Sequence, residues 1–319
     1  ISDGASTELC FLIFAMLTLG IIFAGVRNGI ERVSKIMMPI LVLLSFLITA
    51  YSITRPGALA GVKYFLIPNP ENFSWMTVVT AMGQMFYSLS IAMGILVTFG
   101  SYMKKDVSIE DSTKNVEIFD TAIAIMAGLM IIPAVFAFSG GDPDTLQAGP
   151  SLMFITIPKV FDSMGLGTVI GILFFVLVLF AAMTSSIALT ESAVSTFEDE
   201  LGWGRKKATV IVGIIMVLLG SLSSLGYGPL AGVTIIGMQF LDFFDFLTNS
   251  VMMPLAALAT CLLVSRVVGI NKIEDEVTEG GKPFRRKKIF QFMIKYLCPI
   301  FAIIILLSSI ANAFGWISM

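Results

Sequence analysis

Histidine is absent from this 319-residue sequence, and cysteine occurs only three times, at Cys10, Cys261 and Cys298. The absence of histidine excludes acid–base catalysis by imidazole and histidine ligation of haem or zinc. Three scattered cysteines do not form a disulfide framework. Charged residues are scarce too, at 13%, and the net charge of −2 gives no reason to expect a nucleic-acid partner. Neither a nucleophile–base pair nor a phosphate-binding loop is evident, so we expect that the protein is not an enzyme.

Hydrophobic residues make up 56% of the chain. Apolar runs of about 20 residues, the length that crosses a hydrocarbon core of ~30 Å, recur along the whole sequence. They lie at roughly 8–26, 35–54, 75–102, 115–139, 166–197, 207–226, 232–268 and 290–315. The sequence therefore predicts an all-α polytopic membrane protein.

The basic residues are distributed unevenly between the loops. If the spans alternate in direction, loops 27–35, 103–114, 203–207 and 265–295 share one side, which holds every Lys and Arg except Arg55, Lys63 and Lys159. Short cytoplasmic loops carry the excess of Lys and Arg, so that side is predicted to be cytoplasmic. The protein is then a multi-pass protein of the plasma (inner) membrane, with both ends of this chain on the extracellular or periplasmic side.

The chain opens with ISDGASTELC, which has no initiator methionine, positive n-region or cleavage site. A start on the outer side requires an odd number of earlier spans if the protein itself starts in the cytoplasm. We therefore expect this chain to be the later part of a longer protein.

The stretch GQMFYSLSIAMG, residues 83–94, places Gln84, Ser88 and Ser90 inside a predicted span between two glycines. One interpretation is a glycine-flanked interface between tightly packed helices. The other is a discontinuous helix, whose freed carbonyls coordinate an ion and whose half-helix ends face an anionic group. Irregular backbone at membrane depth is tolerated only where it lines a cavity, so we favour a discontinuous helix that forms a binding site.

Acidic residues within or at the ends of spans are functional candidates by default, because ionisable groups at membrane depth are costly. They are Asp120, Glu191, Asp242 and Asp245. Each also has a plainer interpretation. Asp120 could snorkel to the inner surface, and Glu191 could face a wet inner cavity. Asp242 and Asp245 could mark a hydrated helix end.

Three hydroxyl residues, Thr184, Ser185 and Ser186, lie together in the middle of the apolar segment 174–192. Such hydroxyls routinely bond the backbone one turn back or a neighbouring helix. Beside the small residue Ala181 they could instead offer oxygen ligands to a hard cation. The chemistry alone leaves both interpretations open.

Several motifs carry a family resemblance. GQMFYSLSIAMG resembles the broken sixth helix of the neurotransmitter:sodium symporters, and GVRNGIERVSKIMMP (25–39) resembles the start of their fifth. AAMTSSIAL followed by FEDEL (181–201) is similar to their eighth helix, and LDFFDF (241–246) to the start of their tenth. In this order the matches cover essentially the whole chain. They identify it as similar to the bacterial, LeuT-type amino-acid transporters of that family.

The resemblance implies a LeuT-type inverted-repeat fold with family helices 4–11 present and helices 1–3 missing. Residues 1–54 would be the remnant of the first repeat, family helices 4 and 5, and 55–74 an extracellular loop. Residues 75–268 would form the second repeat, family helices 6–10, with an extracellular loop near 140–165. Residues 269–319 would be a basic cytoplasmic loop and helix 11. Because the first helix supplies sodium ligands and a gating arginine, we expect the chain as given to be incomplete.

The resemblance also implies two sodium sites. Ser88 would bind the first ion through its carbonyl and hydroxyl, and Asp120 falls where the family has an asparagine ligand. A carboxylate there could supply the charge that chloride provides in animal relatives, so chloride is expected not to be required. The Ala181 carbonyl and the hydroxyls of Thr184 and Ser185 would bind the second sodium.

The implied substrate pocket comprises Tyr87, Ser90, Met93, Ser185 and Leu189. Met93 stands where the leucine-transporting member has phenylalanine. Because a flexible, polarisable side chain can yield to a larger ring and contact it through sulfur, we expect an aromatic or bulky hydrophobic L-amino acid as substrate.

Gating residues are implied as well. Asp245 would be half of the outer gate, paired with an arginine on the first helix. Asp199 would be the inner-gate carboxylate, with Tyr102 nearby. Gly29 and Pro39 resemble a motif whose unwinding opens a water path to the second sodium.

The resulting prediction is sodium-coupled symport of an amino acid by alternating access. Sodium would be the only cofactor, and the partners would be a small-molecule amino acid and the lipid bilayer. Two alternatives stay open, a channel-like membrane subunit lined by the acidic residues and a non-transporting fragment.

Overall fold

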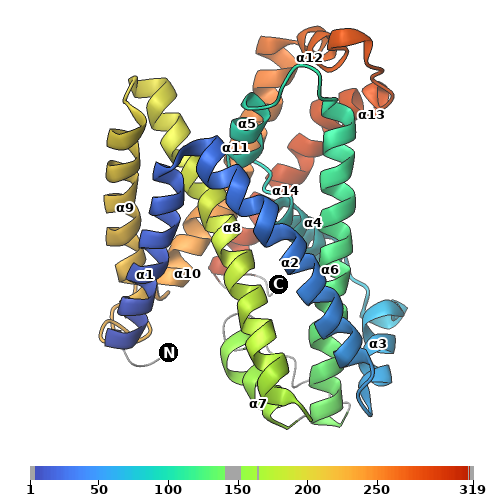
Figure 1. The fold of residues 1–319 in the computed structure, drawn as a ribbon. Helices are drawn as coiled ribbons and strands as arrows, with labels where there is room; N and C mark the ends of the chain where they lie inside the picture. Colours follow the sequence, from blue (N-terminus) through green and yellow to red (C-terminus); the bar gives the residue numbers. More distant parts are fainter. Residues whose placement is uncertain (1–3, 141–151, 164, 315, 317–319) are drawn as a thin grey trace. The chain divides into compact units, whose positions relative to one another are not determined.

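The structure is a computed structural model that describes residues 4–140, 152–163, 165–314 and 316, and within these ranges it contains helices and no named strand (Figure 1). The α-helices are α1 (Gly4–Phe23), α2 (Arg32–Ile53), α3 (Ala58–Leu66), α4 (Trp75–Ser88), α5 (Ile95–Ser101), α6 (Ile109–Ser139), α7 (Ile157–Asp162), α8 (Gly167–Leu201), α9 (Arg205–Leu225), α10 (Phe240–Asp245), α11 (Met253–Leu262), α12 (Ile270–Val277), α13 (Lys287–Phe292) and α14 (Cys298–Ala313).

Several helices continue through π-helical turns, which widen a helix locally without ending it. Because of these turns, the helical runs Phe240–Val268 and Lys287–Ala313 are long enough to cross a membrane. The π-helical turns are Val26–Glu31, Leu152–Thr156, Phe246–Met252, Leu263–Val268 and Met293–Leu297.

Seven helices in the described part of the chain are long and apolar enough to span a membrane, and each coincides with a predicted span. The eighth predicted span, 75–102, is the pair α4 and α5. Some predicted boundaries were wrong. The span predicted at 232–268 becomes helical only at Phe240, because 226–239 is made up of turns, irregular backbone and an isolated bridge between Ile235 and Met238.

The predicted loops contain more helix than expected. All of 27–35 is helical, and an ion pair of 2.6 Å between Glu31 and Lys35, one turn apart, supports that extension. The predicted loop 55–74 contains α3, and 265–295 contains α12 and α13. These helices extend beyond their apolar segments through polar residues, so the length of an apolar run underestimates the length of the helix. Residues 141–151 of the loop predicted near 140–165 lie outside the described residues.

Contacts divide the chain into two compact units, each described here by itself. Unit 1 comprises Ile1–Gly25, Ser74–Val116 and Ile187–Met319, and unit 2 comprises Val26–Phe73 and Glu117–Ser186. The long helices α6 and α8 each contribute residues to both units.

Unit 2 is built on α2, α3, α7 and the unit 2 parts of α6 and α8. A Cβ at Gly61 of α3 would lie 2.7 Å from the Pro133 Cα of α6, so glycine permits this close approach. The core of the unit is a buried cluster made up of Leu44, Ile48, Met130, Ala134, Val135, Ile157, Val160, Phe161, Ile170, Phe174 and Leu177.

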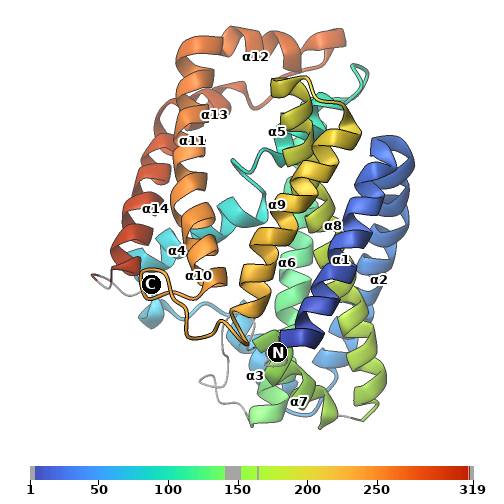
Figure 2. The same ribbon diagram turned by 90° about the vertical axis from the view of Figure 1, so that its left-hand side faces the viewer.

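Unit 1 contains two helix pairs, α1 with α9 and α11 with α14, each of which lies side by side in both views (Figures 1 and 2). Phe86 of α4 is buried against Met253 and Ala257 of α11 and Ala302 and Ile305 of α14. The first half of the interrupted helix is thereby anchored to the α11–α14 pair.

Candidate functional site

The helix that the sequence predicts to be discontinuous is interrupted between α4, which ends at Ser88, and α5, which begins at Ile95. Between them Ser90 and Ala92 have φ values of 54° and 63°, and Gly94 has φ 79°. Left-handed backbone costs non-glycine residues about 1–2 kcal/mol each. The prediction of a break is confirmed, and surrounding contacts must hold this strained conformation.

Hydrogen bonds within the break turn the chain away from the helix. The Ile91 amide donates to the Phe86 carbonyl at 3.0 Å. The Met93 amide would bond the Leu89 carbonyl in a continuous helix, but it lies 3.5 Å from the Ser90 carbonyl instead. The break therefore takes main-chain carbonyls out of the helical ladder, and such oxygens can coordinate a cation.

Gly94 is a point where the broken helix closely approaches α8. A Cβ at this position would lie 2.6 Å from the Ser192 Oγ. The same Ser192 hydroxyl lies 3.4 Å from the Thr98 Oγ1 of α5. Glycine is thus favoured at position 94 both by its positive φ and by the contact with α8.

Three of the predicted substrate residues lie at the break. Tyr87 is the penultimate residue of α4, and Ser90 and Met93 lie in the break itself. Met93 packs against the cluster around Phe86, whereas the Tyr87 side chain is exposed. Leu189, also exposed, lies on the unit 1 part of α8. Ser185 belongs to unit 2, so the complete pocket stays a prediction.

The predicted second sodium site lies on α8 within unit 2. The Thr184 hydroxyl donates to the Ala181 carbonyl at 2.9 Å and approaches the Phe180 carbonyl at 3.1 Å. Two of the three predicted ligand groups are therefore adjacent, and Ser185, the third, is exposed on the same helix. The same bonds are the ordinary behaviour of a hydroxyl in an apolar helix, so the assignment stays a prediction.

The predicted ligands of the first sodium come from different units. Asp120 is half-buried on α6 in unit 2. Ser88 ends α4 in unit 1 and is exposed. Their joint role in one site also stays a prediction.

The predicted gating residues have the following contacts. Asp245 ends α10 and accepts a hydrogen bond from the Asn249 side-chain amide one turn later. Asp199 accepts a bond of 3.5 Å from the Ser195 hydroxyl on α8. Gly29 is buried in the π-helical turn Val26–Glu31, and Pro39 lies inside α2.

A buried ionic group connects Glu191 of α8, Arg205 at the start of α9 and Tyr102 after α5, and we call it the Glu191 node. Glu191 is fully buried, and its Oε2 lies 2.6 Å from the Arg205 Nη2. Arg205 Nη1 donates to Glu191 Oε1 at 3.1 Å, and the Tyr102 hydroxyl donates to the same oxygen at 2.8 Å. The partner of Tyr102 is thus Glu191, while Ser195 lies against both Tyr102 and Asp199.

Arg205 also fixes the end of α1. Its Nε and Nη2 donate to the Ile22 carbonyl at 3.1 and 3.0 Å. This carbonyl lies in the last turn of α1, where helical carbonyls lack a partner of their own. One guanidinium therefore joins α1, α8 and α9 and neutralises a carboxylate that burial alone would make very costly.

From the sequence, Glu191 is a functional candidate without an identified partner, and Arg205 is one of the basic residues that make the loops asymmetric in charge. The missed signal is the short turn 202–204, which makes α8 and α9 a helical hairpin. A basic residue at the start of one helix can then reach an acidic residue on the other. The bond of Tyr102 to Glu191 has no comparable signal, because 89 positions separate the two residues.

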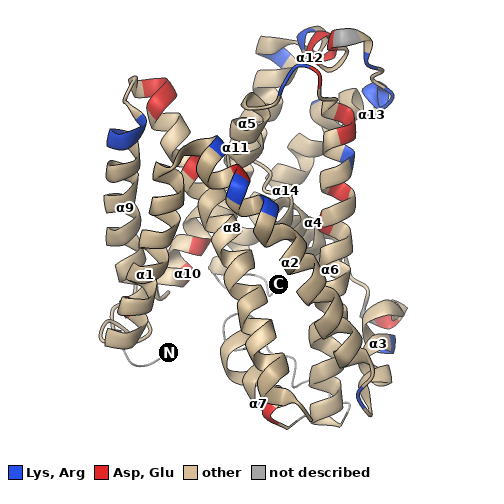
Figure 3. Cartoon of the chain, viewed as in Figure 1, with Lys and Arg blue, Asp and Glu red and all other residues tan. Residues whose placement is uncertain are grey.

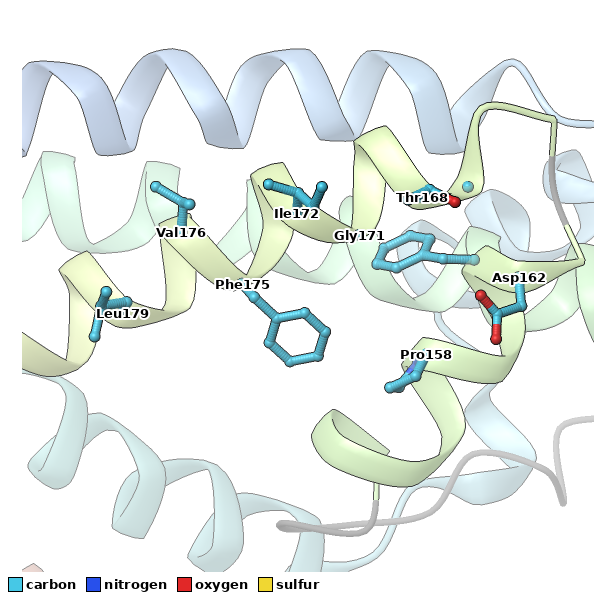
Figure 4. A pocket seen from close by; sticks show the side chains of 10 residues that line it. Pro158, Asp162, Thr168, Gly171, Ile172, Phe175, Val176 and Leu179 are labelled. Atoms are coloured by element: carbon cyan, nitrogen blue, oxygen red, sulfur yellow. The ribbon is translucent and has the colours of Figure 1, made fainter. Parts of the chain in front are cut away.

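Two cavities of unit 2 contain no predicted sodium or substrate residue. One, of about 510 Å³, runs along the first half of α8 from Thr168 to Leu179, with Asp162 of α7 at the Thr168 end (Figure 4). The other, of about 770 Å³, lies between α2 and α6 and includes Pro39 in its lining. Both are lined mainly by apolar side chains, including Phe175 in the first and Phe46 in the second.

Known proteins resemble this chain over most of its length. The model of the sodium:neurotransmitter symporter family matches residues 2–315. An uncharacterized sodium-dependent transporter of Bacillus subtilis, YhdH, is 34% identical over 97% of this chain and 68% of its own length. A sodium-dependent transporter of Haemophilus influenzae is 31% identical over 95% of this chain and 65% of its own.

Among solved structures, that of MhsT in complex with L-phenylalanine matches with a TM-score of 0.81 and 36% identity, covering 93% of this chain and 67% of MhsT. The fold is therefore that of a LeuT-type membrane transporter. The chain belongs to the sodium:neurotransmitter symporter family, whose members are sodium-coupled transporters and not enzymes. It spans about two thirds of the length of these relatives.

Proposed function

We propose that this chain, within its full-length protein, carries out sodium-coupled symport of an amino acid by alternating access. The observation that supports the proposal is the strained break from Leu89 to Gly94, which lies where the family resemblance puts substrate and sodium. A membrane helix that gives up hydrogen bonds and adopts left-handed backbone needs a compensating role, and ligand binding is such a role.

The driving force follows from charge. One positive charge that moves down a membrane potential releases ~2.3 kcal/mol per 100 mV. Sodium bound beside the substrate carboxylate makes the two binding events mutually favourable, and that coupling is reciprocal. One or two sodium ions can therefore drive an amino acid uphill, provided that partly loaded carriers do not reorient.

The Glu191 node supports a role as the inner gate. It joins the end of α5 to α8, α9 and α1 at the end of unit 1 that is predicted to be cytoplasmic. Because α5 is the second half of the broken helix, release of Tyr102 from Glu191 would let this half move while α8 and α9 stay fixed.

The proposed substrate is an aromatic or bulky hydrophobic L-amino acid. Met93 at the break supports this, because a thioether adapts its shape and makes favourable contacts with rings. The similar transporter MhsT has been solved in complex with L-phenylalanine, which is consistent with the proposal.

Chloride is proposed not to be required, because Asp120 supplies a fixed negative charge near the first sodium. Asp120→Asn should therefore make sodium-driven uptake respond to chloride. The wild-type protein should transport equally well when gluconate replaces chloride. Uptake by the variant that is indifferent to chloride would contradict this role of Asp120.

The deciding experiment is uptake of radiolabelled L-tryptophan, L-phenylalanine and L-leucine by the full-length protein in liposomes with an inward sodium gradient. We expect saturable uptake that is lost when choline replaces sodium, with D-tryptophan as the control. A sodium current without stereoselective binding would favour the channel interpretation. A properly folded protein without sodium-dependent binding or uptake would favour the non-transporting one.

A further inference from the structure

Two connections of unit 1 meet beside the inner half of the broken helix. One joins α5 to α6, and the other joins α12 to α13. Lys282 Nζ donates to the carbonyls of Lys105 and Val107 at 2.7 and 2.8 Å. We call this set of contacts between the connections the clasp, and Figure 3 shows the charged residues gathered around α12 and α13.

Two further contacts complete the clasp. Lys105 Nζ lies 2.9 Å from Glu279 Oε1, and the Arg285 amide donates to Glu110 Oε2 at 2.8 Å. Hydrogen bonding to Glu279 raises the pKa of Lys105, so this lysine stays charged. The Lys105 side chain is 85% exposed, however, and exposed ion pairs contribute little to stability.

Lys282 is the central residue of the clasp. Residues 104–107 form a tight turn, closed by the Val107 amide on the Lys104 carbonyl at 3.0 Å. A turn closed in this way directs other carbonyls outward, and the Lys282 ammonium bonds two of them in contacts that are open to solvent. Hydrogen bonds from a charged donor are stronger than neutral ones, so Lys282 fixes the conformation of this turn.

The clasp connects two elements with different roles. The turn begins two residues after Tyr102, the residue of the Glu191 node that closes α5. The segment that carries Lys282 is fixed by Lys287 Nζ, which lies 2.6 Å from Glu274 of α12. Through α12 and α13 this segment continues into the α11–α14 pair, on which Phe86 of α4 is buried. The clasp therefore fastens the inner half of the broken helix to the pair that anchors its outer half.

We propose that Lys282 is a positioning residue of the inner gate, which holds the 104–107 turn so that Tyr102 stays directed at Glu191. Loss of its two hydrogen bonds frees the turn and weakens the Tyr102 contact without removing any ligand of sodium or substrate. The role in gating rests on the proposed function, whereas the role in holding the turn does not.

Hydrogen exchange of the full-length protein tests the structural half. In Lys282→Gln, the amides of 103–108 should exchange about tenfold faster, the effect of losing charge-assisted bonds. Amides of α4 and α14 should be unchanged, which separates local release from unfolding. Lys282→Arg should restore much of the protection. The control is Lys288→Gln, an exposed lysine of α13 without a hydrogen bond or ion pair among the described residues. Equal exchange in Lys282→Gln and the control would overturn the proposal.

A double-mutant comparison tests the gating half. Lys282→Gln should change maximal uptake several-fold and leave equilibrium amino-acid binding almost unchanged, and this effect should largely vanish in a Tyr102→Phe background. If the effects of the two substitutions on uptake were additive, the proposal that Lys282 acts through Tyr102 would be wrong. If the unchanged protein transports no amino acid, the proposed function fails, while hydrogen exchange still decides whether Lys282 holds the turn.

Discussion

The broken helix α4–α5 and the unbroken helix α8 present oxygen atoms within a membrane segment in different ways. Between Ser88 and Ile95 the backbone leaves the helical ladder and accepts positive φ values, which frees carbonyls at a cost in strain. Helix α8 stays continuous from Gly167 to Leu201 and offers hydroxyls instead, as the bonds of Thr184 to its own backbone illustrate. Strain thus accompanies the carbonyls freed at the break, whereas the hydroxyls proposed as ligands on α8 leave that helix intact.

The largest expected effect on stability is at the buried ion pair between Glu191 of α8 and Arg205 of α9. Arg205→Met removes the partner of the fully buried Glu191 and should lower the free energy of unfolding by about 3–5 kcal/mol. Thermal unfolding in detergent or lipid measures this loss. Glu191→Gln added to Arg205→Met should recover much of it, because the fully buried carboxylate is then neutral and only the half-buried Glu198 loses its arginine partner, at 3.4 Å.

The matched control is Lys206→Met, which changes the exposed neighbour of Arg205 and should leave stability within about 0.5 kcal/mol. If Arg205→Met and Lys206→Met unfold at the same temperature, the Glu191 node contributes nothing to stability.

Substitutions in the break should reduce stability less than loss of Arg205, and they should do so through backbone strain, which the regular helix α8 does not have. Gly94→Ala places a Cβ 2.6 Å from Ser192 Oγ at a φ of 79°, and should cost about 2–4 kcal/mol from backbone strain and overpacking. Ala92→Gly, two residues earlier, relieves a positive φ and should change stability by less than about 1 kcal/mol. Equal losses in thermal stability would mean that the strain argument for the break is wrong.

The hydroxyls of α8 should affect sodium rather than stability. Thr184→Ala combined with Ser185→Ala should raise the half-saturating sodium concentration about tenfold, because two proposed ligands are lost. Thermal stability should change little, since within the described part of the chain the Thr184 hydroxyl bonds carbonyls of its own helix. Ser186→Ala, next in sequence and outside the proposed site, is the control. Unchanged sodium affinity in the double variant would contradict the assignment of the second site.

The smallest effect is expected for the side chain that shapes the substrate pocket. Met93→Phe should shift the preference between tryptophan and leucine by a few-fold, away from the larger ring. Met82→Phe makes the same change at a residue of α4 that packs on the same cluster, and should leave the preference unchanged. Competition binding measures the relative affinity for tryptophan and leucine in both variants. If this preference is unchanged in Met93→Phe, Met93 does not line the substrate pocket.

Sequence reasoning predicted the spans and the break well, because both depend on local patterns. Seven spans follow from apolar length, and the eighth was correctly expected to be discontinuous from Gln84, Ser88, Ser90 and the flanking glycines. Helix ends were predicted less well. Polar segments such as Glu31–Lys35 and Ile270–Val277 are helical through side-chain pairing and the burial of a few residues, which apolar run length does not register.

The sequence by itself determined that this is a helical membrane protein of the sodium:neurotransmitter symporter family, because apolar length, charge asymmetry and motif order are written along the chain. Tertiary structure decided which polar groups meet. Glu191 is neutralised by Arg205 and bonded by Tyr102, and Lys282 holds a turn 175 positions away, at Val107. Hydrogen bonds and ion pairs act over a few ångströms, so partners that lie far apart in the chain become visible only once the helices are packed.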